Sequence, residues 1–517
     1  MSSNRDARKQ ARRAAQAQKV AAKGEAEAEW FWQCVAAAAG RRGGSRGGKG
    51  GNRNAANEAE LFGKQLTQGI NFDQYDTIPV SRSCDVGVKV VEKIPDLADF
   101  YALDGDERVP RFLFNNVQRM GYAKPTPIQR HSIPICLDGR ADLMCCAQTG
   151  SGKTCAFLLP AIACIAQSVS PPQPPAPPLA GHGGKGRGGK GKGGETTSQY
   201  FTPARPRVLV LAPTRELAIQ IELEAKKLTF ASNLRPVVVY GGAPARGQLQ
   251  ELADGVDVLV ATPGRLTDFL DRALVSLAWC EFLILDEADR MLDMGFEPQL
   301  RRIVERSDLS SNQRPVTSKG VPRRTLMFSA TFPAEIQRLA GKYLRPYAYV
   351  AVGRVGSTTA SIEQRLVWVS SSSCHKRAKM ELLVPVLRDT RPSGDMDGDA
   401  TANVHTGCPI GRTIVFVQKK HVANWVRREL QKHWNIPAEE IHGDRSQAQR
   451  EAALARFKDG KCIVLVATDV AARGLDIPNV NHVVNFDLPP SKEEFDSYVH
   501  RIGRTGRAGN VGLATSL

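Results

Sequence analysis

Short apolar runs that end in small or polar residues recur along this chain. Between residues 142 and 331 they lead into a series of polar segments, namely QTGSGKT, PTRELA, GG, TPGR, DEAD and SAT. Runs of this length, separated by helix-like stretches such as ELAIQIELEAKKL, are typical of buried strands in a parallel sheet covered by helices. Because the carboxyl ends of parallel strands share one edge, the pattern predicts that the polar segments meet there, where open α/β sheets bind ligands.

The same pattern begins again after residue 360. The apolar runs RLVWV, RTIVFV, CIVLVA, HVVNF and GLATS predict a second sheet of the same kind. The expected fold class is therefore α/β, with two tandem domains built on parallel sheets. We expect a disordered basic arm at 1–68, an N-terminal extension at 69–132, a first domain at 133–352, a linker at 353–362 and a second domain at 363–517.

The charge of the chain is concentrated in two segments. Of a formal net charge of +17, residues 1–53 contribute 12 Lys and Arg against 4 Asp and Glu, and residues 168–207 contribute 6 against 1. Such a balance indicates nucleic acid or another anionic surface as a partner. The Gly- and Pro-rich composition predicts disorder, with 168–207 as an exposed loop inserted into the first domain. For the arm, two interpretations stand: contacts with RNA phosphates, or a solvating tail without a specific partner.

The charged N-terminus and the cysteine spacing predict an intracellular protein. The N-terminus is charged where a secretory signal would be apolar, and no apolar run reaches the roughly 20 residues of a membrane span. The 11 cysteines include no C-x-x-C pair. Free thiols in a reducing compartment explain them better than a disulfide framework or a zinc site does. We expect a cytoplasmic protein.

The segment AQTGSGKT at 147–154 departs from the phosphate-binding pattern G-x-x-x-x-G-K-[ST] only in its first residue, Ala147. It follows an expected strand and precedes an expected helix, as such a loop must. Its backbone N–H groups would surround phosphate oxygens, Lys153 would reach the β and γ phosphates, and the Thr154 hydroxyl would bind Mg²⁺. The whole segment is therefore a candidate ATP site: Ala147, Gln148, Thr149, Gly150, Ser151, Gly152, Lys153 and Thr154.

Two acidic residues follow the expected strand FLIL. Asp286 can bind the Mg²⁺ water shell, and Glu287 can orient and deprotonate an attacking water. A solvated helix start would explain a short acidic match on its own. The apolar strand before it and the upstream phosphate loop favour the catalytic interpretation.

The segment HRIGRTGR at 500–507 spaces arginines at 501, 504 and 507, which would align them on one helix face. A basic surface helix is one interpretation. The other is that Arg504 and Arg507 neutralise charge at the γ-phosphate during transfer. Because Lys153 and Glu287 lie in the first domain, such a site would be complete only when the domains close.

In this order, the segments resemble the motifs of the DEAD-box RNA helicases. The resemblance covers residues 69 to 517 and rests on GYAKPTPIQ at 121–129, AQTGSGKT, PTRELA at 213–218, TPGR at 262–265, DEAD at 286–289, SAT at 329–331, ATDVAARGLDIP at 467–478 and HRIGRTGR. The segments GINFDQYDTIPV, RMLDMGFEPQLRRIVE, AVGRVGSTT and IHGDRSQ are similar to the Belle and Vasa branch of that family.

The resemblance implies two RecA-like domains with ATP and Mg²⁺ as cofactors and RNA as partner. It implies roles for further residues by position. Adenine and ribose contacts fall on Tyr122, Lys124, Gln129 and Asp476; RNA backbone contacts on Arg215, Gly242, Thr262, Arg265, Gln447, Arg450, Thr468 and Arg473; interdomain coupling on Ser329, Thr331, Asp289 and His500; and Mg²⁺ on Thr154 and Asp286.

The implied activity is an RNA-stimulated ATPase that binds single-stranded RNA between its domains and unwinds short duplexes or remodels ribonucleoproteins, in mRNA translation. Translation factors or proteins of RNP granules are the implied partners. The alternative is an ATP-gated RNA clamp or granule scaffold with little unwinding.

Two departures from the family pattern qualify the resemblance. The usual aromatic, 25 positions before Gln129, falls on Asp104, with Phe100 and Tyr101 nearby, so either the register shifts or adenine is held more loosely. The chain also stops just after GLATS, where we expect the second sheet to lack a covering helix.

Overall fold

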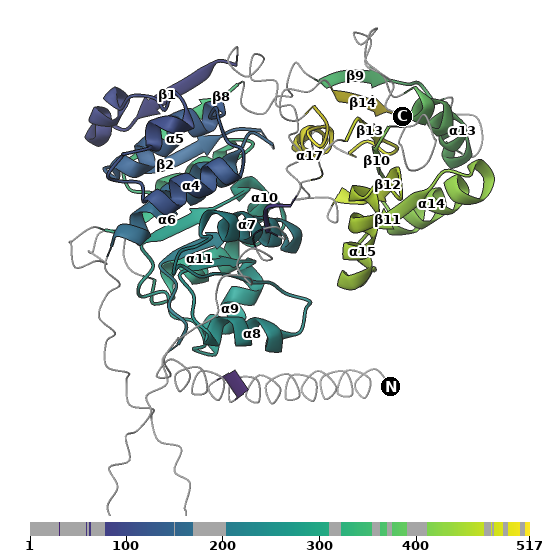
Figure 1. The fold of residues 1–517 in the computed structure, drawn as a ribbon. Helices are drawn as coiled ribbons and strands as arrows, with labels where there is room; N and C mark the ends of the chain where they lie inside the picture. The colour runs from purple at the N-terminus through teal and green to yellow at the C-terminus, as the bar shows by residue number, and fades with distance from the viewer. Residues whose placement is uncertain are drawn as a thin grey trace, which may run out of the picture.

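The computed structural model describes most of both expected domains and a few residues before them. These are residues 30–31, 58, 61–63, 78–148, 150–168, 203–309, 322–353, 362–369, 375–389, 411–469, 477, 480–489, 495–506 and 512–517. Most of the basic arm, residues 169–202 of the insertion and the loop at 390–410 lie outside this set. Figure 1 shows the first domain in purple to teal and the second in green to yellow.

The first sheet has eight strands in the order β1-β8-β2-β7-β6-β3-β5-β4. All of its pairs are parallel except β1 with β8 at the edge. Strand β1 falls in the segment expected to be an extension, so the sheet begins earlier than the apolar runs indicated. The strands are β1 Val80–Cys84, β2 Asp142–Cys146, β3 Val208–Leu211, β4 Pro236–Val239, β5 Val258–Ala261, β6 Phe282–Leu285, β7 Arg324–Ser329 and β8 Tyr347–Val352.

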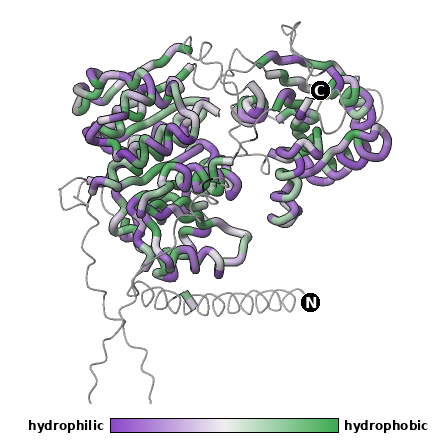
Figure 2. Tube along the Cα trace, in the orientation of Figure 1, coloured by the Kyte–Doolittle hydropathy of each residue, from purple (hydrophilic) through white to green (hydrophobic). Residues whose placement is uncertain are grey.

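Helices cover both faces of this sheet, because its central strands are apolar on both sides. Figure 2 shows the strands as hydrophobic and the outer helices as mixed. One hydrophobic cluster packs against α5 and α6, and another against α8, α9 and α12. The helices are η1 Val86–Lys93, η2 Phe100–Leu103, α4 Arg111–Arg119, α5 Pro127–Asp138, α6 Lys153–Gln167, α7 Arg215–Leu228, α8 Ala245–Ala253, α9 Pro263–Asp271, α10 Ala288–Asp293, α11 Glu297–Glu305 and α12 Ala334–Tyr343.

The second sheet has six parallel strands in the order β11-β12-β10-β13-β14-β9. The two RecA-like α/β domains expected from the sequence are thus confirmed. The strands are β9 Ile362–Leu366, β10 Thr413–Phe416, β11 Ala438–Ile441, β12 Val464–Ala467, β13 His482–Asn485 and β14 Gly512–Ser516, and the helices are α13 His375–Arg388, α14 Lys420–Trp434, α15 Gln447–Lys458 and α17 Phe495–Ile502.

The first strand of this sheet is three residues earlier than its apolar run indicates. RLVWV spans 365–369, but β9 spans Ile362–Leu366, because it pairs residue by residue with β14, which ends at Ser516. Leu366, the last residue of β9, and Trp368, which follows it, are 79% and 90% exposed. The apolar character of the run therefore reflects surface side chains as well as sheet pairing.

A buried arginine joins the two ends of the insertion between α6 and β3. Arg207 is 4% exposed, and its Nε donates to Glu281 Oε1 at 2.7 Å. Its Nη1 donates to the Ile165 carbonyl at 2.7 Å, and the guanidinium also contacts the Ser168 hydroxyl. Arg207 therefore holds the last turn of α6 next to the start of β3.

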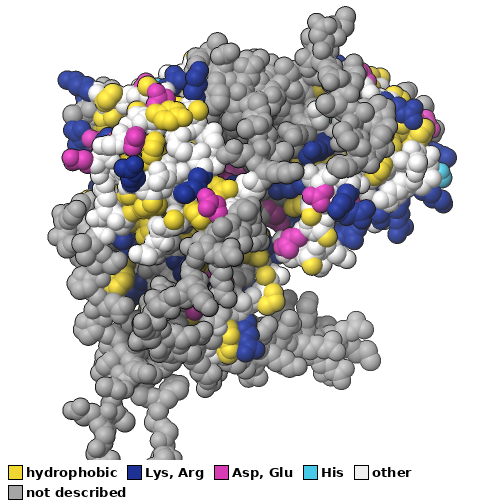
Figure 3. Space-filling view, in the orientation of Figure 1, with side chains coloured by type: hydrophobic (Ala, Val, Ile, Leu, Met, Phe, Trp, Pro, Cys, Tyr) yellow, Lys and Arg dark blue, Asp and Glu magenta, His cyan; other side chains and the backbone are white. Residues whose placement is uncertain are grey.

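The described surface of the second domain is basic around α14. Figure 3 shows Lys and Arg side chains gathered at the right of the view, where Figure 1 places this helix. Arg428 and Lys432 of α14 are exposed. Within the described ranges, no helix combines the length and the apolar character that crossing a membrane requires.

A buried histidine should make the second domain sensitive to acid. His482 in β13 is fully buried, and its Nε2 lies 2.8 Å from the Thr515 hydroxyl of β14. Burial, with a smaller effect of Arg365, lowers the pKa of His482 to about 3. Below about pH 6.5 the unfolded chain therefore takes up a proton that the folded chain resists, so stability falls as pH decreases toward 3.

We expect wild-type protein to lose about 2 kcal/mol more stability between pH 7 and pH 5 than the variant His482→Gln. This is the effect, over that pH range, of one histidine whose pKa is about 3 in the folded chain and near its ordinary value in the unfolded chain. Urea unfolding of the second domain at the two pH values measures this difference. His433→Gln, which changes an exposed histidine of α14, serves as the control and should follow the wild type. Identical pH dependence in His482→Gln and wild type would contradict the assignment.

Candidate functional site

The loop at 147–154 connects β2 to α6 at the carboxyl edge of the first sheet. Its first backbone N–H, at Ala147, donates to the Ser329 carbonyl at the end of β7, 3.0 Å away. Lys153 is 7% exposed, and its Nζ donates to the Ala147 carbonyl at 2.8 Å. Gly150 and Gly152 both have positive φ, 80° and 85°. The loop therefore surrounds the Lys153 side chain and holds its ammonium beside the end of β2. Thr149 lies outside the described residues.

Helix α5 holds this loop from the side. Thr126 and Gln129 form a capping box at its N-terminus. The Thr126 hydroxyl donates to the Ser151 carbonyl at 2.7 Å, and Gln129 Nε2 donates to the Gly152 carbonyl at 3.1 Å. A Cβ on Gly152 would overlap the Gln129 amide. Gln129, expected from the resemblance to read adenine, therefore also fixes the loop next to which a nucleotide would bind.

An aromatic pair flanks the same helix. The rings of Phe100 and Tyr122 stack with centroids 5.7 Å apart, and Phe100 is 1% exposed. Tyr101 is 60% exposed, and Asp104 follows the short helix η2. The structure therefore places Phe100, and not Asp104, against Tyr122. Lys124 is exposed.

Two carboxylates stand where β6 ends. The Asp286 N–H donates to the Leu211 carbonyl of β3 at 3.0 Å, which continues the sheet pairing, and Asp286 Oδ1 accepts from the Glu287 N–H at 3.0 Å. Burial raises the pKa of Asp286 to about 7, with Lys153 opposing and Glu287 adding to the shift. A cation bound nearby would therefore stabilise the ionised form of the Asp286 carboxyl.

The backbone of Glu287 is strained. Its φ of 48° and ψ of 54° lie in the left-handed region, which costs a non-glycine residue about 1–3 kcal/mol. The side chain is 5% exposed, and its Oε2 has no hydrogen-bond partner among the described residues. A buried, unpaired carboxylate oxygen on a strained turn is the arrangement expected of a group kept ready for a reacting molecule.

Asp289 connects this turn to the SAT segment and to the second domain. Its Oδ2 accepts from the N–H groups of Ala330 and Thr331, at 3.1 and 3.0 Å, and from the Thr331 hydroxyl at 3.0 Å. The same oxygen lies 3.6 Å from Nε2 of His500 in α17. The Ser329 hydroxyl is buried without a partner among the described residues.

The protonation states of this pair differ. Burial acts to raise the pKa of Asp289, but its contact with His500 and the charges of Arg290 and Lys153 hold it well below the usual range. Burial and, next, Arg290 lower the pKa of His500 to about 4, with Asp289 opposing. His500 is therefore neutral near pH 7, and its contact with Asp289 is a polar one rather than an ion pair.

The expected alignment of three arginines on one helix face is wrong. Helix α17 ends at Ile502, and Arg504 lies in the turn that follows, 4% exposed, with its Nε donating to the His500 carbonyl at 3.2 Å. Arg501 points inward and pairs with Asp469 at 2.5 Å. Because the helix ends before Arg504, the spacing does not place Arg501 and Arg504 on one helix face. Arg507, Arg473 and Asp476 lie outside the described residues.

Some of the expected RNA-contacting residues of the two domains contact one another. Arg215, at the start of α7, donates through Nη1 to Gln447 Oε1 at 3.3 Å, at the start of α15. Gly242 has a φ of 78°, and a Cβ there would overlap the Arg215 guanidinium. Arg215 is therefore placed against the second domain by the absence of a side chain at Gly242.

A carboxylate that the sequence reasoning missed completes this cluster. Glu216 pairs with Arg450 at 2.8 Å and accepts from Gln447 Nε2 at 3.4 Å. The side chains of Glu216 and Arg450 are 6% and 14% exposed, so water is largely excluded from the pair. The sequence offered one signal for Glu216, namely its position next to Arg215 in the segment PTRELA. We refer to Arg215, Glu216, Gln447 and Arg450 as the cross-domain cluster.

The other candidates shape the loops around this cluster. Arg265 donates to the carbonyls of Tyr240 and Ala243 at 3.1 and 2.8 Å, so it holds the loop that carries Gly242. Thr262 and Thr468 are each 7% exposed at the ends of β5 and β12. Their backbone N–H groups extend sheet pairing by one bond each.

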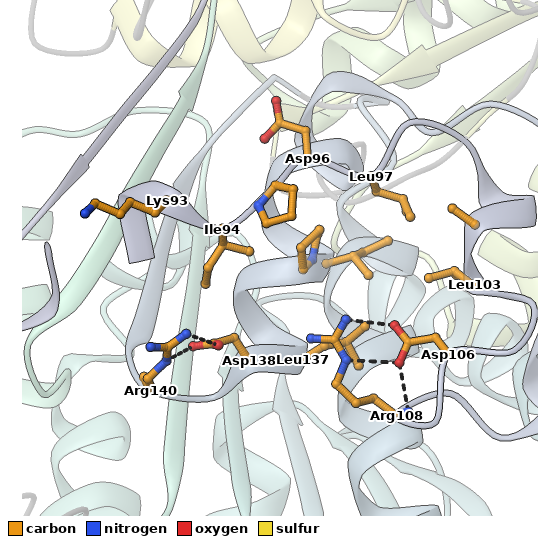
Figure 4. Close-up of a pocket in the computed structure, with 14 residues that line it drawn as sticks. Lys93, Ile94, Asp96, Leu97, Leu103, Asp106, Arg108, Leu137, Asp138 and Arg140 are labelled. Carbon is orange, nitrogen blue, oxygen red and sulfur yellow. Dashed lines mark hydrogen bonds and ion pairs between the residues drawn. The ribbon is translucent and has the colours of Figure 1, made fainter. Parts of the chain in front are cut away.

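A cavity of about 350 Å³ lies away from all these residues, between α5 and the segment 93–108. Figure 4 shows two ion pairs among its charged side chains, Arg108 with Asp106 and Arg140 with Asp138, and Lys93 and Asp96 outside these pairs. The rest of its lining is Ile, Leu, Pro and Ala. Neither the phosphate loop nor the cross-domain cluster contributes to it.

Comparisons with known families match both domains. The model of the DEAD/DEAH box helicase matches residues 126–339, and that of the helicase conserved C-terminal domain matches residues 403–509. The two matches include the phosphate loop, the two carboxylates, the cross-domain cluster and His500.

Solved structures agree with these matches. The yeast DEAD-box splicing factor Prp28 is 31% identical over 86% of this chain and 85% of its own, with a TM-score of 0.43. S. cerevisiae Dbp5, bound to RNA and ADP BeF3, is 24% identical over 80% and 88%, with a TM-score of 0.59. Mss116p, bound to ssRNA and AMP-PNP, is 26% identical over 81% and 74%, with a TM-score of 0.62.

Replacing Gly242 by Ala should weaken RNA binding by roughly tenfold, because a left-handed backbone with a Cβ costs about 1–2 kcal/mol and the Cβ displaces Arg215. Fluorescence anisotropy with single-stranded RNA measures the change. Gly247→Ala in α8 is the matched control, since a Cβ there meets nothing within 4 Å. Equal affinities for the two variants would show that this loop does not position Arg215.

Proposed function

The chain belongs to the DEAD-box RNA helicase family, and on that premise we propose that it binds ATP at the edge of its first domain and single-stranded RNA across both domains. Hydrolysis would then proceed when the domains close, and closure would separate short duplexes locally. The observation that carries this proposal is the contact of Asp289 with both the SAT segment and His500, because it links the nucleotide edge of one domain to the other.

The nucleotide edge offers the groups that ATP chemistry needs. Lys153 and the loop N–H groups suit phosphate oxygens, and Arg504 is buried in the second domain beside His500. Closure would bring the Arg504 guanidinium toward the charge that develops on the γ-phosphate. Glu287, with its unpaired oxygen, would orient the attacking water and accept its proton.

The residues present fit Mg²⁺. Asp286 is a buried carboxyl whose pKa burial raises, and Thr154 is a half-buried residue in the first turn of α6. Mg²⁺ is commonly held by one or two such groups together with substrate phosphates. When bound with ATP, it would neutralise phosphate charge during transfer.

The cross-domain cluster would hold the RNA backbone. Its arginines and amide suit phosphate oxygens, and its members come from both domains, so a strand bound there would favour closure. The solved structure of Mss116p, to which this chain is 26% identical, is bound to ssRNA and AMP-PNP, which supports RNA and ATP as ligands here. Contacts with the backbone rather than the bases would make the choice of RNA broad.

The cellular role we propose is remodelling of mRNA–protein complexes during translation in the cytoplasm, including RNP granules, with translation factors as partners. Support comes from the sequence segments similar to the Belle and Vasa branch, among them RMLDMGFEPQLRRIVE and IHGDRSQ. An RNA clamp or granule scaffold is the other outcome, and turnover separates the two.

ATP hydrolysis with and without single-stranded RNA, together with release of a short duplex, tests the function. Lys153→Ala, Glu287→Gln and Arg504→Ala should each reduce turnover by about a thousandfold. Only Lys153→Ala should act chiefly by weakening nucleotide binding, which fluorescent ADP measures. Wild-type turnover in Arg504→Ala would refute the two-domain site, whereas slow wild-type turnover with long-lived RNA complexes would indicate a clamp.

Glu216→Gln should raise the RNA concentration needed for half-maximal ATPase about tenfold, because loss of a largely buried ion pair removes a contact that favours closure. Nucleotide binding without RNA should be unchanged. Glu222→Gln is the matched control, since Glu222 lies on the same helix but pairs with Lys226 within the first domain. If both variants behave alike, the Glu216–Arg450 pair does not contribute to closure.

A further inference from the structure

A buried carboxylate lies in the edge strand of the second sheet. Glu440 belongs to β11, which Figure 1 shows beside α14 and α15, and its side chain is 1% exposed. Its Oε1 accepts from Arg445 Nη2 at 2.5 Å and from Asn424 Nδ2 at 3.0 Å. Arg427 Nε lies 3.4 Å from the same oxygen. Because a carboxylate is costly to bury alone, these partners account for its place in the sheet.

The partners of Glu440 come from two separate elements. The amide and one arginine belong to α14, whereas Arg445 lies in the turn 442–446 that leads from β11 into α15. A second link between α14 and this turn is the pair of Lys420 with Asp444, but both side chains are more than half exposed. Exposed pairs contribute little, so the buried carboxylate is the main side-chain link between α14 and the turn.

The turn leads directly into the second-domain half of the cross-domain cluster. Helix α15 begins at Gln447, two residues after Arg445, and Arg450 follows in the same first turn. Ser446 and Gln449 close this helix start as a capping box. Both Gln447 and Arg450 contact the first domain. A change in the direction of this first turn would therefore move two of the side chains proposed to bind RNA.

Stability alone does not explain a carboxylate at this position. On the same face of β11, Ala438 packs into an apolar cluster with Val464 of the neighbouring strand. Apolar side chains in place of a buried ion pair are often as stabilising as the pair or more so. What the pair adds is direction, since its hydrogen bonds hold the joined groups in one geometry. At Glu440, the group held in this way is the turn before α15.

We propose that Glu440 is a positioning residue for RNA binding. Its carboxylate holds Arg445, and thereby the first turn of α15, in the direction that presents Gln447 and Arg450 to a bound strand. Glu440 itself is buried and does not contact RNA. The inference deepens the proposed function and rests on it, because it assumes that the cross-domain cluster holds RNA. RNA affinity depends on Glu440, whereas the chemistry at the nucleotide edge does not.

The test measures the ATPase of the full chain over a range of single-stranded oligouridine concentrations. Glu440→Gln keeps the shape of the side chain but removes its charge, and should raise the concentration for half-maximal stimulation about fivefold. The maximal rate at saturating oligouridine should stay at the wild-type level. A change that only lowered stability would do the opposite. It would reduce the folded fraction, and so the maximal rate, but leave the half-maximal concentration unchanged.

Two further variants separate positioning from damage to the fold. Arg445→Gln removes the other member of the pair, whose side chain is 28% exposed, and should give the same shift. Combining it with Glu440→Gln should add little, because both changes break one contact. Glu439→Gln is the matched control. Glu439 is the preceding residue of β11, but it pairs with Arg456 in the last turn of α15, at 3.1 Å.

A wild-type half-maximal concentration in both Glu440→Gln and Arg445→Gln would overturn the inference. An equal shift in Glu439→Gln would overturn it as well, since any weakened contact of β11 with α15 would then be sufficient. If oligouridine does not stimulate the wild-type ATPase, the proposed function fails and this inference fails with it. That result is distinct from the others, because it appears in wild type before any variant is compared.

Discussion

One oxygen of Asp289 accepts three hydrogen bonds from the SAT segment and lies 3.6 Å from His500 of the other domain. That carboxylate is 5% exposed, so its position is set by protein groups and not by water. Nε2 of His500 has no hydrogen-bond partner among the described residues. A shift of well under 1 Å would bring it within hydrogen-bonding distance. Small rearrangements at the nucleotide edge can therefore decide whether the domains are bonded at this point.

The remaining interdomain contacts are of a different kind. The cross-domain cluster combines an ion pair with amide contacts between α7 and α15, both of which begin at the carboxyl edges of their sheets. These side chains also suit RNA phosphates. They pair with one another across the two domains, so a strand bound there would share those contacts. RNA affinity and domain closure are consequently coupled through the same few atoms.

Sequence pattern predicted the two sheets well where the strands are continuous and apolar, as in FLIL and VLVL, because burial on both faces leaves a clear signal. Strand β1 was missed, since the three central residues of VSRSC are polar and the strand is held by antiparallel pairing with β8, more than 260 residues away. The limits of β9 were misplaced for a similar reason. In both cases the partner strand sets the boundary, and local composition does not carry that information.

The residues of the candidate site likewise fall into those that the sequence predicted and those that it did not. The phosphate loop and the acidic turn were predicted because their chemistry depends on contiguous residues. Glu216 and the Phe100–Tyr122 stack were not assigned, since each acquires its meaning from a residue far along the chain. Arg501 was placed on a common helix face with Arg504, but α17 ends at Ile502 and Arg504 lies in the turn that follows. A spacing of three residues predicts a shared face only while the helix continues, and the spacing does not show where the helix ends.

The junction of α6 and β3 has a consequence for engineering. Arg207 joins Ile165, Ser168 and Glu281 in one buried network, so the two chain ends at the insertion are already side by side. Loop-closure cost then grows only by about 0.6 kcal/mol for each doubling of the intervening length. The position is therefore a natural place to splice in a fluorescent reporter or an affinity module, at the edge of the sheet opposite the phosphate loop.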